Sequence, residues 1–88
     1  MHKKYTTHLD CQHGWMGVPL KDLKTLGIEN QISMSSRQKG ATVYLEGDSD
    51  LSLFMSAAER AGWEVQQNSR NHDYWWPGRN YPRYKPAT

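Results

Sequence analysis

The chain has 88 residues, of which 36% are hydrophobic and 23% are charged, and its formal net charge is +2. This length suits one domain and is too short for two, and the small core expected for it leaves little room for an enclosed active site. The single cysteine excludes an internal disulfide framework, and no apolar run approaches the roughly 18 residues of a membrane span. We therefore expect one small domain in a reducing cytoplasm, with no membrane partner.

The first part of the chain predicts a strand followed by a short helix. Residues 5–18 alternate and carry side chains that favour strands, so we expect a strand centred on residues 14–18, in which the glycines indicate a bulge or a close backbone approach. Residues 19–26 begin with a proline and have leucines at three-residue spacing, which indicates a helix. Gly27 then supplies a left-handed stop.

The middle of the chain predicts a β-hairpin and then a longer helix. Residues 28–36 and 41–46 alternate on either side of a turn at residues 38–40, which is typical of a hairpin. Residues 47–50 offer acidic and hydroxyl caps, and residues 51–62 repeat apolar side chains with helical spacing before a terminal glycine. We expect this second helix to be the clearest element of the fold.

The last predicted strand covers residues 63–67, and it is followed by an irregular arm over residues 68–88. We assign residues 1–67 to an α+β core and treat the arm as part of the same domain. The order βαββαβ matches the ferredoxin-like, or split-βαβ, arrangement, in which both helices cover one face of an antiparallel sheet. A three-stranded variant with the first strand detached is the main alternative.

The sequence contains His-Gly-Trp-x-x-Val-Pro at residues 13–19, Leu-Gly-Ile at 26–28, Ile-Ser at 32–33, Val-Tyr-Leu-Glu-x-Asp-x-Asp at 43–50 and Tyr-Pro-Arg-Tyr at 81–84. These blocks resemble a family of small uncharacterised proteins from phages and mobile elements. The chain departs from the family pattern at Gly47, at Ser49 and in Trp-Trp-Pro-Gly at residues 75–78. The resemblance implies a phage or prophage origin, a place in the host cytoplasm and stoichiometric interference with a host process. It implies no catalytic activity.

The N-terminal segment holds weak candidates for a metal site or a nucleophile, namely His8, Cys11 and His13. Imidazole and thiolate ligands suit tetrahedral zinc, but this spacing matches no established zinc motif. A thiol beside an imidazole can also form a nucleophilic pair, yet no oxyanion or phosphate-cradling motif accompanies it. We expect no cofactor, no metal and no enzymatic activity, and we interpret these side chains as polar surface or strand residues.

The C-terminal arm combines aromatic and cationic side chains. Rings beside cations are typical of single-stranded nucleic-acid sites, and Tyr, Trp and Arg also dominate protein–protein interfaces. A third possibility is that the arm folds back so that its tryptophans cover a core short of aliphatic side chains. The residues that we expect at an interface with a host protein are Tyr74, Trp75, Trp76, Arg79, Tyr81, Arg83 and Tyr84.

Four further cations are candidates for nucleic-acid contacts: Arg37, Lys39, Arg70 and Lys85. Two of them belong to the hairpin loop, where a solvated turn is the simpler interpretation. We expect a phosphate contact from this loop only if it lies beside the arm.

Three functions follow, in order of preference. The leading hypothesis is a phage protein that binds a host protein and inhibits or redirects a host process such as defence. The runner-up is a small nucleic-acid-binding module, and the third is a minor metal-binding protein. A homodimer is a further possibility, because an open sheet leaves two edges that a second copy can pair with.

Overall fold

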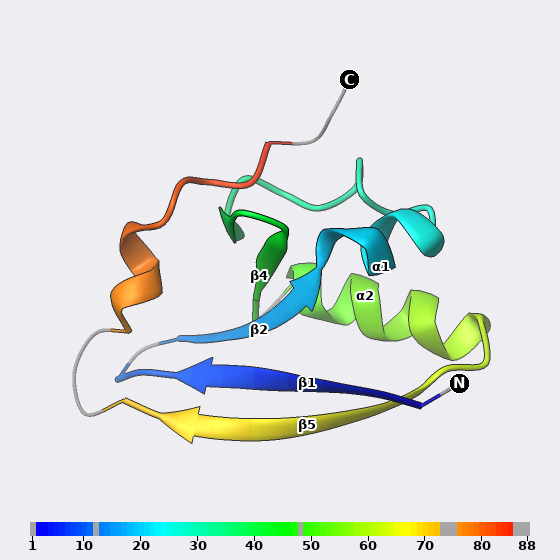
Figure 1. Cartoon of the computed structure of the whole chain (residues 1–88), viewed down its shortest axis with the longest axis horizontal. Helices are drawn as coiled ribbons and strands as arrows, with labels where there is room; N and C mark the ends of the chain where they lie inside the picture. Colours follow the sequence, from blue (N-terminus) through cyan, green and yellow to red (C-terminus); the bar gives the residue numbers. More distant parts are fainter. Residues whose placement is uncertain (1, 12, 48, 73–75, 86–88) are drawn as a thin grey trace.

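The computed structural model describes residues 2–11, 13–47, 49–72 and 76–85. Within these residues, two helices, α1 (Leu20–Thr25) and α2 (Ser49–Arg60), accompany a 3-10 helix, η1 (Pro77–Asn80). The described part of the sheet has five strands, which are β1 (His2–Leu9), β2 (Gly14–Pro19), β3 (Arg37–Lys39), β4 (Thr42–Glu46) and β5 (Glu64–Asn71). Figure 1 shows α1 and α2 on one side of this sheet and the C-terminal arm on the other. The predicted α+β class is confirmed.

The strand order is β3-β4-β2-β1-β5. From β2 onward, the elements follow the predicted βαββαβ order of a ferredoxin-like fold. β1 is an additional strand that lies between β2 and β5, antiparallel to the first and parallel to the second. The sheet is therefore mixed. β2 and β5, which flank β1, run in opposite directions, as the split-βαβ arrangement requires.

The single strand predicted over residues 5–18 is two strands joined by a tight turn. Asp10 closes this turn, because its carboxylate accepts a hydrogen bond of 2.9 Å from the His13 amide and its own amide donates to the His13 carbonyl at 3.0 Å. Both strands alternate, so the pattern of residues 5–18 did not reveal where the first ended and the second began. The hairpin gives β2 a partner on each side.

The strand predicted over residues 28–36 is a series of turns. Ile28 and Ile32 of this segment are buried in the core, and Asp50 at the start of α2 holds the segment in place. The Asp50 carboxylate accepts hydrogen bonds from the backbone and hydroxyl of Ser33 and from the hydroxyl of Ser36, at 2.6 to 3.1 Å. The predicted cap residue Asp50 is thus buried and binds a loop rather than solvent. The hairpin strand begins later, at Arg37.

The two helices occupy the predicted positions. Gly27 ends the α1 segment with a φ of +72°, a left-handed conformation that glycine adopts without strain. α2 buries Phe54, Ala57 and Ala58 against the sheet, and the Phe54 ring meets the Tyr5 ring edge to face at 5.4 Å. These contacts place the main core between the helices and one face of the sheet.

The boundary set at residues 67 and 68 runs through the middle of β5, which continues to Asn71. This extension exists because β1 supplies a parallel partner from His2↔Glu64 to Leu9↔Asn71, a long-range pairing that the local pattern of residues 68–71 does not indicate. Beyond β5, the described arm forms η1 and then runs alongside β3.

Candidate functional site

The open face of the sheet is the one turned away from α1 and α2, and an aromatic cluster covers one end of it. Trp76 lies at the centre of this cluster and is 4% exposed. Its ring stacks on His8 with centroids 5.0 Å apart and planes 14° apart. The rings of Trp15, Tyr44 and Tyr81 lie within 5.7 Å of it, centroid to centroid. The Trp76 amide donates to Asp10 at 3.2 Å, which fixes the arm to the turn between β1 and β2.

The structure places the predicted interface residues in three groups. Trp76 and Tyr84 are buried. For Trp76 this agrees with the alternative in which the arm's tryptophans cover the core, and the role of both residues at an interface stays a prediction. Both side chains have partners within the chain. The Trp76 ring stacks on His8 on the open face, and the Tyr84 hydroxyl donates to the Glu29 carbonyl. Tyr81 and Arg83 remain at least partly accessible. Tyr74, Trp75 and the Arg79 side chain lie outside the described residues.

The arm runs alongside the β3 edge, so it lies beside the hairpin. The Gln38 amide donates to the Pro82 carbonyl at 2.9 Å, and the Tyr84 amide donates to the Ser36 carbonyl at 2.8 Å. Arg37 and Arg83 form an antiparallel bridge between the two segments. The hairpin cations are therefore next to the arm, which was the stated condition for a phosphate contact.

Cations and rings meet where the arm crosses the hairpin. The Lys39 ammonium lies 4.9 Å from the centroid of the Tyr81 ring, an attractive arrangement for a cation over an aromatic face. One Arg37 guanidinium nitrogen reaches the Tyr81 carbonyl at 3.5 Å, and one from Arg83 reaches the Met34 carbonyl at 3.3 Å. We call Arg37, Lys39, Tyr44, Tyr81 and Arg83 the arm–hairpin surface.

A groove of about 1040 Å³ lies between the arm and the start of β2. Its lining includes the two arginines of the arm–hairpin surface, the indoles of Trp15 and Trp76, and the Glu46 carboxylate. It is therefore walled by rings and carries both signs of charge. Such a groove suits a ligand that has a flat apolar part and an anionic group.

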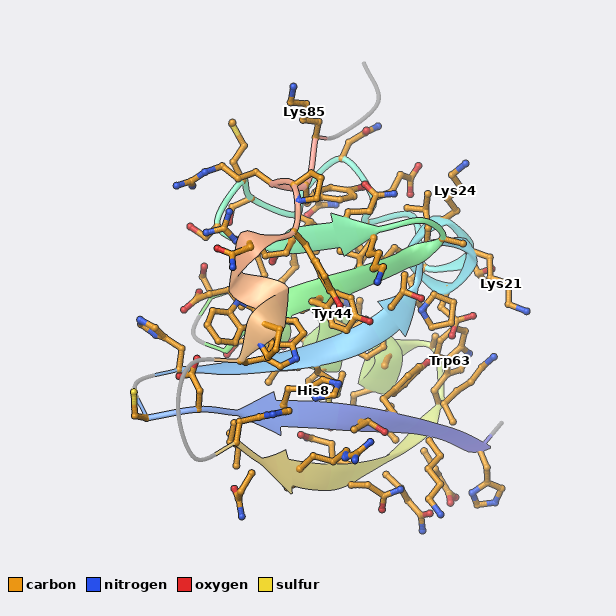
Figure 2. All side chains as sticks on the ribbon, turned by 60° about the vertical axis from the view of Figure 1, so that its left-hand side comes forward. His8, Lys21, Lys24, Tyr44, Trp63 and Lys85 are labelled. Carbon is orange, nitrogen blue, oxygen red and sulfur yellow. The ribbon has the colours of Figure 1, made fainter. Side chains whose placement is uncertain are left out.

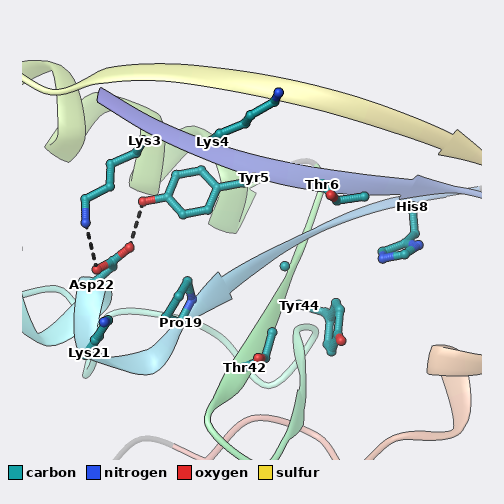
Figure 3. A pocket seen from close by; sticks show the side chains of 11 residues that line it. Lys3, Lys4, Tyr5, Thr6, His8, Pro19, Lys21, Asp22, Thr42 and Tyr44 are labelled. Atoms are coloured by element: carbon teal, nitrogen blue, oxygen red, sulfur yellow. Dashed lines mark hydrogen bonds and ion pairs between the residues drawn. The ribbon is translucent and has the colours of Figure 1, made fainter. Parts of the chain in front are cut away.

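A second groove, of about 490 Å³, crosses the open face beyond the aromatic cluster (Figure 3). Its floor is Gly17, and a Cβ atom there would lie 3.1 Å from Cε1 of the Tyr44 ring. The missing side chain at position 17 thus lets the Tyr44 ring lie across β2. Lys4 and Lys21 line the same groove, and Figure 2 shows Tyr44 near the middle of the face with Lys21 beyond the end of β2.

The far end of this second groove is formed where β1 and β2 separate. Their pairing ends at Thr6↔Gly17, and the Asp22 carboxylate bridges the gap by accepting hydrogen bonds from the Tyr5 hydroxyl at 2.8 Å and the Lys3 ammonium at 3.5 Å. Burial first, and then the bond and charge of Asp22, raise the pKa of Tyr5 far above its usual range. No local motif predicted this cluster, because its members come from β1 and α1.

Two ring side chains of the open face, Tyr44 and His8, have shifted pKa values. Burial, and to a lesser extent Tyr81, raise the pKa of Tyr44, although Lys39 opposes them. Burial is also the main cause of a lowered pKa at His8, with His72 and Arg70 adding to it. Both shifts favour the uncharged forms of Tyr44 and His8. Arg70 is in register with His8.

The three weak metal candidates do not form a ligand set within the described part of the chain. His8 instead pairs with His72, through Nδ1 and Nε2 at 3.1 Å. Cys11 is exposed and carries a free thiol, and the His13 ring meets Trp15 edge to face at 5.6 Å. Of the remaining predicted cations, Lys85 is exposed in the last described segment of the arm.

Comparison of the chain with protein-family models, with curated proteins and with solved structures found no match. Among the described residues, no helix is long and apolar enough to cross a membrane.

Proposed function

We propose that this chain is a non-catalytic binding protein that takes a single-stranded nucleic acid across the open face of its sheet. The observation that carries the proposal is the meeting of Arg37, Lys39 and Arg83 with the Tyr44 and Tyr81 rings at one end of that face. Cations of this kind hold phosphates, and aromatic faces stack with bases whatever their identity.

Charge continues along the face beyond this surface. Lys4 and Lys21 line the second groove, on the far side of Tyr44 from the arm (Figure 3). A strand lying across the sheet would meet cations at both ends and the Tyr44 ring between them. This arrangement supports a ligand with regularly spaced anionic groups and flat apolar units, which is the chemistry of a polynucleotide.

Burial of the arm's rings is the reason why we place nucleic acid ahead of the protein partner that the sequence favoured. Trp76 and Tyr84 are the anchors on which an aromatic protein interface would depend, and both are enclosed within the chain. The two grooves on the open face are lined by Lys4 and Lys21 and by Arg37 and Arg83. A protein interface core is depleted in charged residues, whereas a nucleic-acid site requires them.

The test is fluorescence anisotropy with labelled single-stranded DNA and RNA oligonucleotides over a series of salt concentrations. We expect binding that weakens steeply with salt, and Lys39→Ala should reduce the slope of log K against log salt by about 0.7, the value for one phosphate contact on a single strand. Lys24→Ala is the matched control, because Lys24 is an exposed residue of α1 that lines neither groove. Absence of binding at low salt, or equal effects of the two variants, would contradict the proposal.

The role of the Tyr44 ring needs its own variants. Tyr44→Leu should weaken binding by about 5-fold to 100-fold or more, since stacking contributes about 1–3 kcal/mol per base. Gly17→Ala should act in the same direction, because its Cβ would lie 3.1 Å from Cε1 of the Tyr44 ring, so that the ring must shift. Unchanged affinity in both variants would show that no base stacks on Tyr44.

A host protein is the second candidate partner, and one observation favours it. Met34 is 53% exposed, and its carbonyl accepts a hydrogen bond from Arg83, so an apolar side chain lies beside the accessible end of the arm. Met, Tyr and Arg are enriched at protein interfaces. Here the phage origin and the host cytoplasm implied by the family resemblance are part of the proposal. Affinity capture from host lysate tests it, with Met34→Ser and Arg83→Ala expected to release the captured partner.

A further inference from the structure

The two edges of the sheet differ in how they are covered. The arm hydrogen-bonds along the β3 edge, through the Gln38 and Tyr84 amides. The β5 edge has no strand partner among the described residues, and Figure 1 shows no described element beyond it. All of β5 except Val65 is exposed, and it contains no proline and no lysine. Proteins usually protect such an edge, because its free amides and carbonyls accept a further strand.

The hydrogen bonding of β5 shows which of its backbone groups point outward. The His72 amide donates to the Leu9 carbonyl of β1 at 2.8 Å. Because the backbone groups of a strand alternate in direction, the groups of residues 64, 66, 68 and 70 also point toward β1. Those of Val65, Gln67, Ser69 and Asn71 therefore point away from the sheet. An antiparallel partner must match its own outward residues to these.

We propose that β5 pairs antiparallel with β5 of a second copy of this chain, with the two-fold axis at Gln67. This register matches outward residues with outward residues: Val65 faces Ser69 of the partner subunit, and Gln67 faces its own counterpart. It also sets Glu64 opposite Arg70 of the partner subunit, twice by symmetry. Both charged residues are exposed, and each belongs to a non-hydrogen-bonded pair, where side chains lie closest.

Charge selects both this occupant and this register. Glu64 and Arg70 are the only charged residues of β5, and they lie three positions on either side of Gln67. An axis at Glu64 or at Arg70 would set like charges opposite each other, which is destabilising. Glu64 already has an ion pair with His2 at 3.0 Å, but both side chains are more than 70% exposed, so this contact leaves the carboxylate accessible.

The dimer would join the two sheets into one of ten strands and would leave both open faces accessible, so it does not depend on the ligand proposed above. An edge contact of this size buries less than the roughly 1600 Å² of a standard interface, which implies a concentration-dependent dimer. Sedimentation velocity over increasing protein concentration should show a species of twice the monomer mass. A monomer at all concentrations would overturn the proposal and leave the edge to a strand of some other chain.

Charge variants test the register. Glu64→Arg and Arg70→Glu should each weaken the dimer at least tenfold, and the double variant should restore it because it only exchanges the two signs. Circular dichroism of each variant checks that the fold is kept. Single variants that dimerise like the parent, or a folded double variant that stays monomeric, would rule out this register.

Cross-linking provides a second, independent measurement. In a Cys11→Ser background, Gln67→Cys should form a disulfide between copies on mild oxidation, because hydrogen-bonded antiparallel pairs have Cα atoms about 5.5 Å apart. Ser69→Cys is the matched control, since its counterpart in the partner lies four residues, about 13 Å, along the strand. Failure of Gln67→Cys to cross-link, or equal cross-linking of both variants, would overturn the proposal.

Discussion

Removing the Trp76 ring tests whether the arm belongs to the folded unit or merely rests on it. Trp76 is 4% exposed and contacts His8, Trp15, Tyr44 and Tyr81. A buried tryptophan removes roughly 150–250 Å² from water, which at about 25 cal/mol per Å² gives an upper limit near 4–6 kcal/mol. Core Trp→Ala substitutions cost about 3–5 kcal/mol. We expect Trp76→Ala to lower the free energy of unfolding by about 3–4 kcal/mol.

Urea unfolding followed by circular dichroism measures this loss, and Trp63→Ala is the matched control. Trp63 is only partly buried and carries the Lys3 ammonium 5.0 Å above its ring, so its removal should cost about 1–2 kcal/mol. The m-value should stay near that of the parent if the arm remains docked through its backbone bonds to β3. A loss for Trp76→Ala no larger than that for Trp63→Ala would refute the view that this ring closes the open face.

Two further predictions concern His8, which is partly buried, and Asp50, which is buried. Because the pKa of His8 is lowered in the fold by burial, His72 and Arg70, the unfolded chain takes up the proton first as the pH falls; stability from this group is therefore present above about pH 6.5 and is lost below it. Urea unfolding should show that the free energy of unfolding falls from about pH 7.5 to about pH 5.5, and that this fall is smaller in His8→Gln than in the parent. An equal fall in the two proteins would contradict the role given to His8. Asp50→Asn should lower the free energy of unfolding by about 2–3 kcal/mol in the same assay, since an amide nitrogen cannot accept the bonds that now reach the carboxylate. A change below about 0.5 kcal/mol, as for an exposed surface substitution, would contradict this role.

Elements were predictable from the sequence where their signal is local. α2 follows from apolar spacing and a terminal glycine, and α1 from Pro19 and its leucines. Residues 28–36 show the limit of that reasoning. Ile32 and Met34 alternate with polar side chains, but Ile32 is buried in a loop and Met34 is exposed. The Asp50 bonds that hold this loop come from a helix further along the chain.

The candidate site was predictable only in its composition. The rings and cations of the arm are plain in the sequence, but their accessibility depends on contacts made across the fold. Trp76 is buried by His8 and Tyr44, residues 68 and 32 positions earlier that meet it only once the sheet has formed. The second groove likewise depends on the separation of β1 from β2, which no local pattern encodes.

The place of β1 in the sheet has a consequence for synthesis on the ribosome. β1 is made before the other strands of this sheet and occupies an internal position, and its parallel partner is β5, which begins at Glu64. Until that late segment emerges, a nascent chain can form only the β1–β2 hairpin and the strands that join it from the other side, with one flank of β1 open to water. Because non-local pairing is slow and leaves such edges unprotected, the growing polypeptide is prone to aggregate in the interval between the emergence of β1 and that of β5.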